Sequence, residues 1–187
     1  MTHHEIEYKT LLSQEEFQKI EKQLLHVDPV SQTNYYFDTE DFALKGHKMS
    51  LRIRTYSDRA ELTLKIPQDV GNLEYNQALS LGTAASTIDS LEFPDGEIKS
   101  IISQHIPIEN LNLLGHLTTV RREIPTKIGL MALDCNTYAG RKDYELELEV
   151  TEAQKGKADF EAFLQANQIK FKYAKSKVAR FSATLAK

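Results

Sequence analysis

Charged and apolar residues alternate along several segments of this 187-residue sequence, and this period of two constrains the fold more than any other feature. The clearest case is Glu5-Ile6-Glu7-Tyr8-Lys9. In a β-strand alternate side chains point to the same face, so these three charges project together. Aligned carboxylates repel one another unless a positive group, most simply a divalent cation, lies between them. The segment therefore predicts a strand that could hold a metal ion.

The same alternation recurs with both signs of charge farther along the chain. A second acidic segment, Tyr144–Val150, places Glu145 and Glu147 on one face and leucines on the other. Basic segments lie between the two acidic ones and present Arg52 with Arg54, Lys65, and Arg121 with Arg122. If the apolar faces meet helices and the charged faces point inward, the strands enclose a lumen with acidic and cationic walls.

Such a lumen suits a phosphate chain bound partly through metal. Guanidinium and ammonium groups donate charge-assisted hydrogen bonds to phosphate oxygens, and carboxylates bind a hard cation such as Mg²⁺ that bridges further oxygens. The alternative is that the charges pair across exposed strands as salt bridges, each contributing roughly 0 to 1 kcal/mol and requiring no ligand. A solvated edge strand also alternates in this way.

Composition indicates an ordinary globular protein. Hydrophobic residues make up 41% and charged residues 27% of the chain, and no apolar run approaches the roughly 18 residues of a membrane span. The net charge of −4 argues against duplex nucleic acid as the main partner. We expect one domain over residues 1–187, a cytoplasmic location without a secretion signal or membrane contact, and a monomer or homodimer.

The expected elements are strands alternating with a few helices. We expect helices from 14 to about 25, over 95–104, from 151 towards 167 with Gly156 as its weak point, and over 174–185. A further helical stretch is expected over 108–114, and 82–90 gives only a loop signal. Strands are expected over 3–12, 33–38, 49–56, 60–67, 73–80, 116–124, 128–137 and 143–150. Eight antiparallel strands can close, so the predicted fold is α+β, a closed β-barrel with helices outside.

Taken in order, these motifs resemble the CYTH superfamily, also called triphosphate tunnel metalloenzymes, over nearly the full length. This group includes thiamine triphosphatases, inorganic triphosphatases and class IV adenylate cyclases. The matching residues are Glu5, Glu7 and Lys9, then Tyr36-Phe37-Asp38-Thr39, Arg52 and Arg54, Lys65, Arg121, Leu133-Asp134, and Glu145 with Glu147.

The resemblance implies an eight-stranded antiparallel tunnel that binds a triphosphate through basic residues and one or two Mg²⁺ or Mn²⁺ ions through carboxylates. The implied metal ligands are Glu5, Glu7, Glu145 and Glu147, with Asp134 either joining them or serving as a turn residue. The implied phosphate ligands are Lys9, Arg52, Arg54, Lys65, Arg121, and Lys175 or Lys177. Arg180 is either a further phosphate ligand or a solvated helix residue, and Glu5, Glu7 and Lys9 would take part directly in catalysis.

Three functions fit this pattern. The leading one is hydrolysis of the terminal phosphate of inorganic triphosphate, thiamine triphosphate or a nucleoside triphosphate. The second is a cyclase that converts ATP to cyclic AMP and pyrophosphate, which would need a pocket for the base. The third is a non-catalytic module that binds polyphosphate or a nucleotide.

Overall fold

The computed structural model describes residues 1–185, whose eight β-strands form a closed barrel in the order β1-β5-β4-β3-β2-β6-β7-β8. The predicted α+β barrel is therefore confirmed. The strands are β1 Thr2–Leu12, β2 Val30–Asp38, β3 Ser50–Thr55, β4 Ala60–Pro67, β5 Asn72–Leu79, β6 Asn112–Thr126, β7 Gly129–Tyr138 and β8 Arg141–Val150. Each differs from its predicted span by only a few residues at either end.

The chain divides into two compact units, which are described separately. The first consists of residues 1–4 and 32–117, and the second of residues 5–31 and 118 onward. The strands β1, β2 and β6 contribute residues to both units. Within the described part of the chain, none of the helices combines the length and apolar character needed to cross a membrane.

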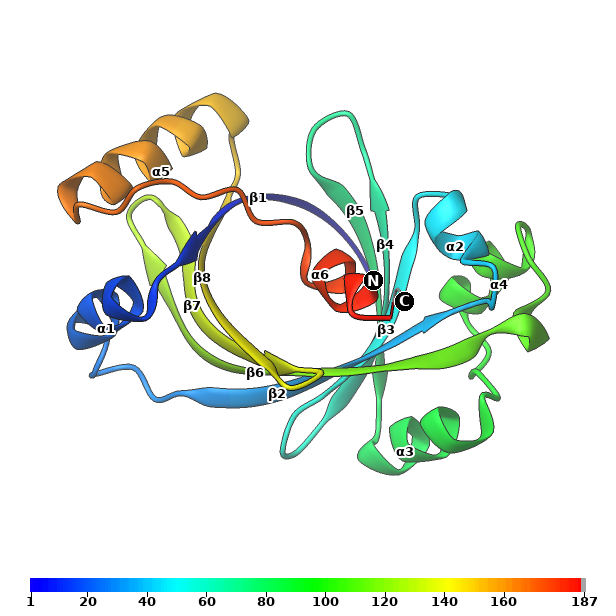
Figure 1. Cartoon of the computed structure of the whole chain (residues 1–187). Helices are drawn as coiled ribbons and strands as arrows, with labels where there is room; N and C mark the ends of the chain where they lie inside the picture. The colour runs from blue at the N-terminus through cyan, green and yellow to red at the C-terminus, as the bar shows by residue number, and fades with distance from the viewer. Residues whose placement is uncertain (186–187) are drawn as a thin grey trace. The chain divides into compact units, whose positions relative to one another are not determined.

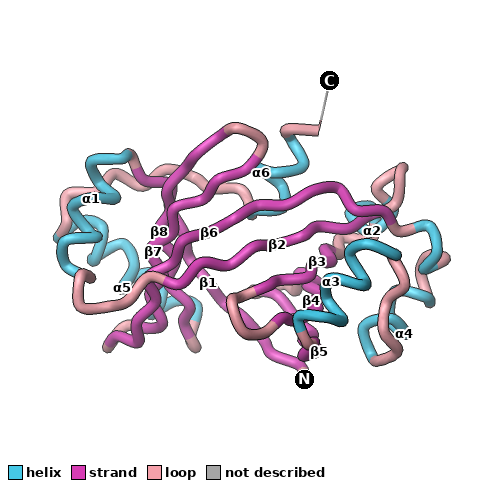
Figure 2. The backbone as a smooth tube through the Cα atoms, turned by 90° about the horizontal axis from the view of Figure 1, so that it is seen from below, coloured by secondary structure: helices cyan, strands magenta, loops and turns pink. Residues whose placement is uncertain are grey.

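The first unit has an apolar core between a twisted sheet and short helices. Strands β2 to β5 pair antiparallel in sequence order, and α3 (Leu81–Ser90) packs on β3, β4 and β5 (Figure 2). The helices α2 (Ala43–Gly46) and α4 (Glu97–Ser103) and a 3-10 turn at Ile108–Asn110 complete it. The core includes Leu51, Ile53, Leu62 and Leu64, whose neighbours Arg52, Thr63 and Lys65 point to the opposite face.

Two local predictions in this unit were wrong. The expected loop at 82–90 is helix α3, which begins where the Ser80 side chain accepts a hydrogen bond from the Thr83 amide and which buries Ala84 and Thr87. Its buried residues are small, so the apolar periodicity is too weak to read from sequence. The expected helical stretch at 108–114 is one 3-10 turn, after which β6 begins at Asn112.

The second unit packs two helices on one face of its sheet. Figure 1 shows α1 (Gln14–Gln23, blue) and α5 (Ala153–Ala166, orange) beside β7 and β8. The capping box that predicted α1 is present, with Ser13 and Glu16 each bonding the other's backbone amide. The core combines helix residues such as Ile20 and Phe160 with Leu146 and Leu148 of β8. The last helix, α6 (Lys177–Ala183), is shorter than the predicted 174–185.

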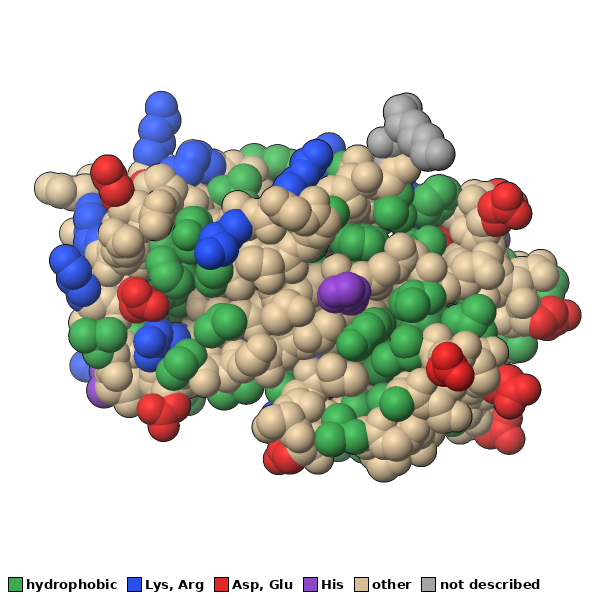
Figure 3. Space-filling model, turned by 60° about the horizontal axis from the view of Figure 1, so that its bottom comes forward, with side chains coloured by type: hydrophobic (Ala, Val, Ile, Leu, Met, Phe, Trp, Pro, Cys, Tyr) green, Lys and Arg blue, Asp and Glu red, His purple; other side chains and the backbone are tan. Residues whose placement is uncertain are grey.

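The outer surface carries charges of both signs. Figure 3 shows Lys and Arg, Asp and Glu, and hydrophobic side chains all reaching one face of the molecule. Exposed charges of this kind are ordinary and say little about function. The informative charges are therefore those that the fold buries.

Candidate functional site

The acidic residues of β1 and β8 and Lys9 share the sheet face opposite the helices. Ile6 and Tyr8 pack against the core of the second unit, and the Tyr8 hydroxyl donates to the Ala153 carbonyl oxygen at 2.7 Å. Glu5, Glu7 and Lys9 alternate with these residues and so project from the other face. The β1–β8 register pairs Lys9 with Glu147.

Three carboxylates, those of Asp134, Glu145 and Glu147, converge on this face. They are buried, with exposed fractions of 0%, 0% and 8%, and each offers an oxygen within 4.8 Å of the others. Asp134 pairs with Glu145 in the β7–β8 register, in the middle of a strand. The alternative of a turn residue is therefore wrong for Asp134. Three buried carboxylates at this spacing form a site that could hold a metal ion.

Arg121 and Lys177 neutralise much of this charge. Arg121 donates from Nε and Nη2 to the two oxygens of Asp134, both at 2.7 Å, and from Nη2 to Glu147 Oε2 at 2.9 Å. Lys177 Nζ lies 2.9 Å from Asp134 Oδ2 and 2.6 Å from Glu147 Oε1, and it also contacts Glu145 Oε1. Lys175, the other basic residue suggested in this segment, is exposed.

A second layer of polar residues extends the network. Arg180 Nη2 lies 2.6 Å from Glu145 Oε2, and its Nη1 lies 3.0 Å from Asp143 Oδ1. Arg180 is therefore part of the acidic cluster and not a solvated helix residue. Tyr138 donates to Asp143 at 2.8 Å, and burial followed by this hydrogen bond raises the pKa of Tyr138 to about 12. Asn136 donates to both Asp143 and Glu145.

These cations set the protonation of the buried acids. Burial alone would raise the pKa of Glu147, but Lys177, Arg121 and Lys9 hold it well below its ordinary value. The pKa of Asp134 is lowered against burial by Lys177 and Arg121. Burial dominates at Glu145 and raises its pKa.

Lys9 is held in its charged form by the same carboxylates. Its Nζ lies 3.0 Å from Glu7 Oε1. Burial would lower the pKa of Lys9, but Glu7, Glu147 and Glu145 raise it above its ordinary value. The fold thus brings Glu7, Lys9, Arg121, Asp134, Glu145, Glu147 and Lys177 together in the second unit.

The first unit carries a basic face. Arg52, Arg54 and Lys65 alternate with core leucines and isoleucine and so share the polar side of β3 and β4. Arg54 Nε donates to Asn34 Oδ1 at 2.8 Å, and Lys65 Nζ lies 3.6 Å from Glu74 Oε2. Within residues 1–185, the buried Nε of Arg52 finds no hydrogen-bond acceptor. A buried guanidinium donor of this kind suits an anionic ligand.

Glu74 is a site residue that the sequence reasoning missed. It pairs with Lys65 in the β4–β5 register, and Asn76 Nδ2 donates to its Oε1 at 3.2 Å. Burial would raise the pKa of Glu74, but Arg52 and Lys65 lower it below its ordinary value. The alternation Leu73-Glu74-Tyr75-Asn76 was the available signal.

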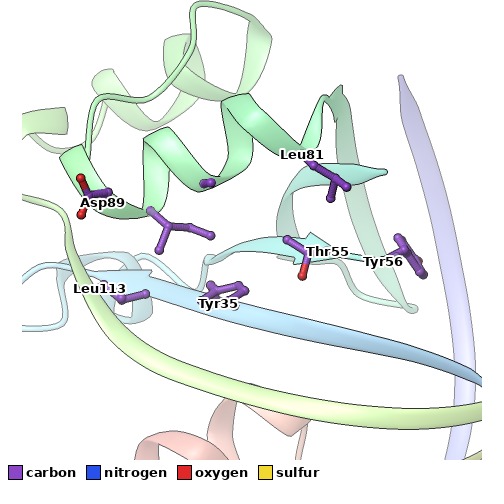
Figure 4. A pocket seen from close by; sticks show the side chains of 8 residues that line it. Tyr35, Thr55, Tyr56, Leu81, Asp89 and Leu113 are labelled. Carbon is purple, nitrogen blue, oxygen red and sulfur yellow. The ribbon is translucent and has the colours of Figure 1, made fainter. Parts of the chain in front are cut away.

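A pocket of about 560 Å³ in the first unit does not belong to this basic face. Figure 4 shows it between α3 and the strands, with Tyr35, Leu81 and Leu113 among its lining side chains. Tyr35 packs with the apolar core, while its neighbour Asn34 contacts Arg54 on the polar side of the sheet. The pocket therefore opens on the face of the sheet opposite Arg54.

Comparison with known proteins gives matches over nearly the whole chain. The CYTH domain model matches residues 3–182. The Bacillus subtilis protein named "Putative triphosphatase YjbK" is 38% identical over 180 residues, covering 95% of this chain and 93% of that protein.

Solved structures agree with the strand arrangement described above. A protein from Bacillus halodurans, described as a putative adenylate cyclase, is 38% identical with a TM-score of 0.90, covering 96% of this chain and 98% of that one. HpAC1 from Hippeastrum, a putative adenylyl cyclase described as revealing a dominant triphosphatase activity, is 25% identical with a TM-score of 0.83, covering 96% and 95%.

Proposed function

The chain belongs to the CYTH domain family, and from this membership and the buried charges we propose that it is a divalent-metal-dependent triphosphatase. The observation that carries the proposal is the burial of Asp134, Glu145 and Glu147 with oxygens within 4.8 Å of one another. Binding phosphate alone requires cations and gives no reason to bury three like charges. A hydrolase that uses a metal ion does have a reason to bury them, because the carboxylates would hold the ion.

The donor set fits a hard divalent cation. All the donors are carboxylate oxygens, which Mg²⁺ and Mn²⁺ accept. Asp134, Glu145 and Glu147 would hold the ion, with Glu5 and Glu7 as further ligands. The ion would neutralise phosphate charge and polarise the phosphoryl group.

The basic residues would bind the phosphate chain. Arg52, through its unpartnered Nε, would donate to a phosphate oxygen, and Arg54, Lys65, Lys9 and Arg121 would supply further cationic donors. Asn34 and Glu74 orient two of these cations, Arg54 and Lys65. Such donors would fix the phosphates before the reaction, and positioning with charge stabilisation supplies most of the rate in phosphoryl transfer.

In the proposed reaction a water oxygen attacks the terminal phosphorus in line with the bridging oxygen. The bond from that phosphorus to the bridging oxygen breaks, and its electron pair stays on the leaving diphosphate group, where the cations stabilise it. The proton lost from the water passes to a nearby carboxylate. The products are inorganic phosphate and the shortened substrate.

Cyclisation of ATP is the second candidate, favoured by the similarity to the Bacillus halodurans protein described as a putative adenylate cyclase. The ribose 3′-oxygen would attack the α-phosphorus and release pyrophosphate. Hydrolysis ranks first because it needs only the phosphate and metal ligands, and because YjbK and HpAC1 are both described in terms of triphosphatase activity.

Product analysis tests the proposal. The protein is incubated with inorganic triphosphate, thiamine triphosphate and ATP, each with Mg²⁺ or Mn²⁺. Glu5→Gln/Glu7→Gln and Glu147→Gln are expected to abolish metal-dependent phosphate release, whereas Glu161→Gln on the exposed face of α5 leaves it unchanged. Cyclic AMP from ATP would establish the cyclase instead. No product from any substrate would leave a non-catalytic binding module.

A further inference from the structure

Lys177 lies among the same three carboxylates that would hold the ion. Its Nζ is within 2.9 Å of Asp134 and 2.6 Å of Glu147, it contacts Glu145, and its side chain is only 9% exposed. The Lys177 ammonium therefore lies where three carboxylate oxygens converge.

This contact also anchors α6 to the sheet. Lys177 is the first residue of α6, and Arg180, one turn later, reaches Glu145 and Asp143. Residues three apart on a helix lie on the same side, so both cations point toward the acidic cluster. Apart from these ion pairs, Phe181 is the large apolar residue of α6 that is buried. The position of α6 thus depends strongly on the charge of the cluster.

An ammonium and a divalent cation cannot share these oxygens. Mg²⁺ binds carboxylate oxygens at about 2.1 Å and requires them to converge on a single point. The ammonium needs the same oxygens at hydrogen-bond distance, and two positive charges that close together repel strongly in a buried site. Binding of one must therefore expel the other.

We propose that Lys177 and a divalent cation compete for Asp134, Glu145 and Glu147, so that binding of the ion releases Lys177 and loosens α6. The ion pairs of Lys177 hold α6 on the sheet, and binding of the ion breaks them and releases the helix. The released ammonium can turn to an anionic ligand, which reconciles its carboxylate contacts with the phosphate role that the family resemblance implies. This inference rests on the proposed function only in assuming that the ion binds these three carboxylates.

Amide hydrogen exchange of the wild-type protein tests directly whether ion binding releases α6. Exchange is measured over residues 177–183 with and without Mn²⁺, in the absence of any triphosphate, while ion binding is followed by electron paramagnetic resonance. Saturating Mn²⁺ is expected to speed exchange in α6 severalfold and to leave α1 unchanged. Bound Mn²⁺ with unchanged or slower exchange in α6 would overturn the proposal.

Variants test the competition. Lys177→Met should bind Mn²⁺ at least about tenfold more tightly, because the ammonium that competes with the ion for the three carboxylates is removed. Lys170→Met, which removes an exposed lysine from the segment leading to α6, should bind Mn²⁺ as the wild type does. Equal or weaker binding by Lys177→Met would contradict the competition. If that variant does not fold, the wild-type exchange measurement still decides.

These measurements separate the two proposals. Neither the exchange measurement nor the Mn²⁺-binding measurement uses a triphosphate or records turnover. If the protein binds Mn²⁺ and releases α6 but hydrolyses nothing, the triphosphatase proposal is refuted and the competition between Lys177 and the ion is supported. If it hydrolyses triphosphate while the amides of α6 stay protected on Mn²⁺ binding, the triphosphatase is supported and the competition is refuted.

Discussion

Arg121 binds Asp134 through two parallel hydrogen bonds, from Nε to Oδ1 and from Nη2 to Oδ2, each 2.7 Å long. The two residues are direct partners in the β6–β7 register, so the strands themselves set this geometry. A guanidinium group matches a carboxylate in this two-point arrangement, and a single ammonium cannot. Together with Lys177, Arg121 holds the pKa of the buried Asp134 below its ordinary value.

Replacing Arg121 should therefore destabilise the protein. Arg121→Met would leave Asp134 and Glu147 short of a buried cation, and we expect a loss of about 3 kcal/mol in the free energy of unfolding. Arg121→Lys, which keeps the charge without the fork, should lose less. Urea denaturation measures both. Lys157→Met is the control, because its ion pair with Glu161 at 3.9 Å lies on the exposed face of α5 and contributes below about 1 kcal/mol. Equal losses at 121 and 157 would contradict the expectation.

Phosphate binding by the basic face predicts a loss of turnover without a loss of fold. Arg52→Met and Lys65→Met should each lower kcat/KM for the best triphosphate substrate by about a hundredfold, as removal of one preorganised donor does in other enzymes. Arg59→Met removes an exposed arginine from the neighbouring β3–β4 turn and should leave kcat/KM unchanged. Steady-state kinetics with circular dichroism decide the matter. Full activity in both variants would remove the basic face from the site.

The Glu74 carboxyl should titrate below the ordinary range. Arg52 and Lys65 lower its pKa in the folded protein, so its stabilising effect is present above the unfolded pKa of 4.5 and is lost as the pH falls through the folded value. Carbon-13 NMR of the Glu74 carboxyl should show this depressed midpoint. In Lys65→Met the midpoint should rise, because one of the two main cations is gone. A midpoint that Lys65→Met does not move would show that Lys65 leaves the charge of Glu74 unaffected.

Gly156 should resist replacement by alanine. Its position in α5 predicted a weak point of the helix, and an alanine there would ordinarily stabilise a helix by about 1 kcal/mol. In the structure a Cβ at Gly156 would lie 2.5 Å from Cγ2 of Val150. We therefore expect Gly156→Ala to destabilise the protein by about 1 to 3 kcal/mol through overpacking.

The double variant Gly156→Ala/Val150→Ala tests that cause. Shortening Val150 removes Cγ1 and Cγ2, two of the three atoms that the new methyl group would meet, and leaves only Cβ. The two changes should therefore cost less together than the sum of the separate losses. Thermal unfolding of the four proteins gives the coupling. If the losses of stability in the two single variants are additive, close packing against Val150 is not the reason why position 156 is a glycine.

Period-two patterns predicted the sheet well because each charged strand buries its other face. Glu7 and Lys9 on β1, or Glu145 and Glu147 on β8, could be placed on one face from sequence alone, since a strand leaves only two choices. The order of the strands in the barrel was not predicted, because alternation does not reveal which strands pair. Helix α3 escaped prediction because it packs through Ala84 and Thr87.

The role of α6 could not be read from the sequence. Lys177 was expected to contact phosphate, yet its ammonium contacts Asp134, Glu145 and Glu147, which lie thirty or more residues earlier in the chain. Only tertiary contacts reveal this, since a lysine in a short C-terminal helix has no periodic signal of its own. Glu74 was missed because its segment shows a single acid among polar residues and aromatics.

The pairing of β1 with β8 has a consequence for biosynthesis. Lys9 is the register partner of Glu147, so the strand that carries Glu5 and Glu7 leaves the ribosome about 140 residues before its neighbour. At typical rates of synthesis this delay is on the order of 10 s. During this delay, the edge of β1 that pairs with β8 in the folded protein has no partner strand on that side. The charged residues of the second unit therefore assemble late, when synthesis is nearly finished, and a chain stalled before residue 141 would carry Glu7 and Lys9 without the strand that completes their surroundings.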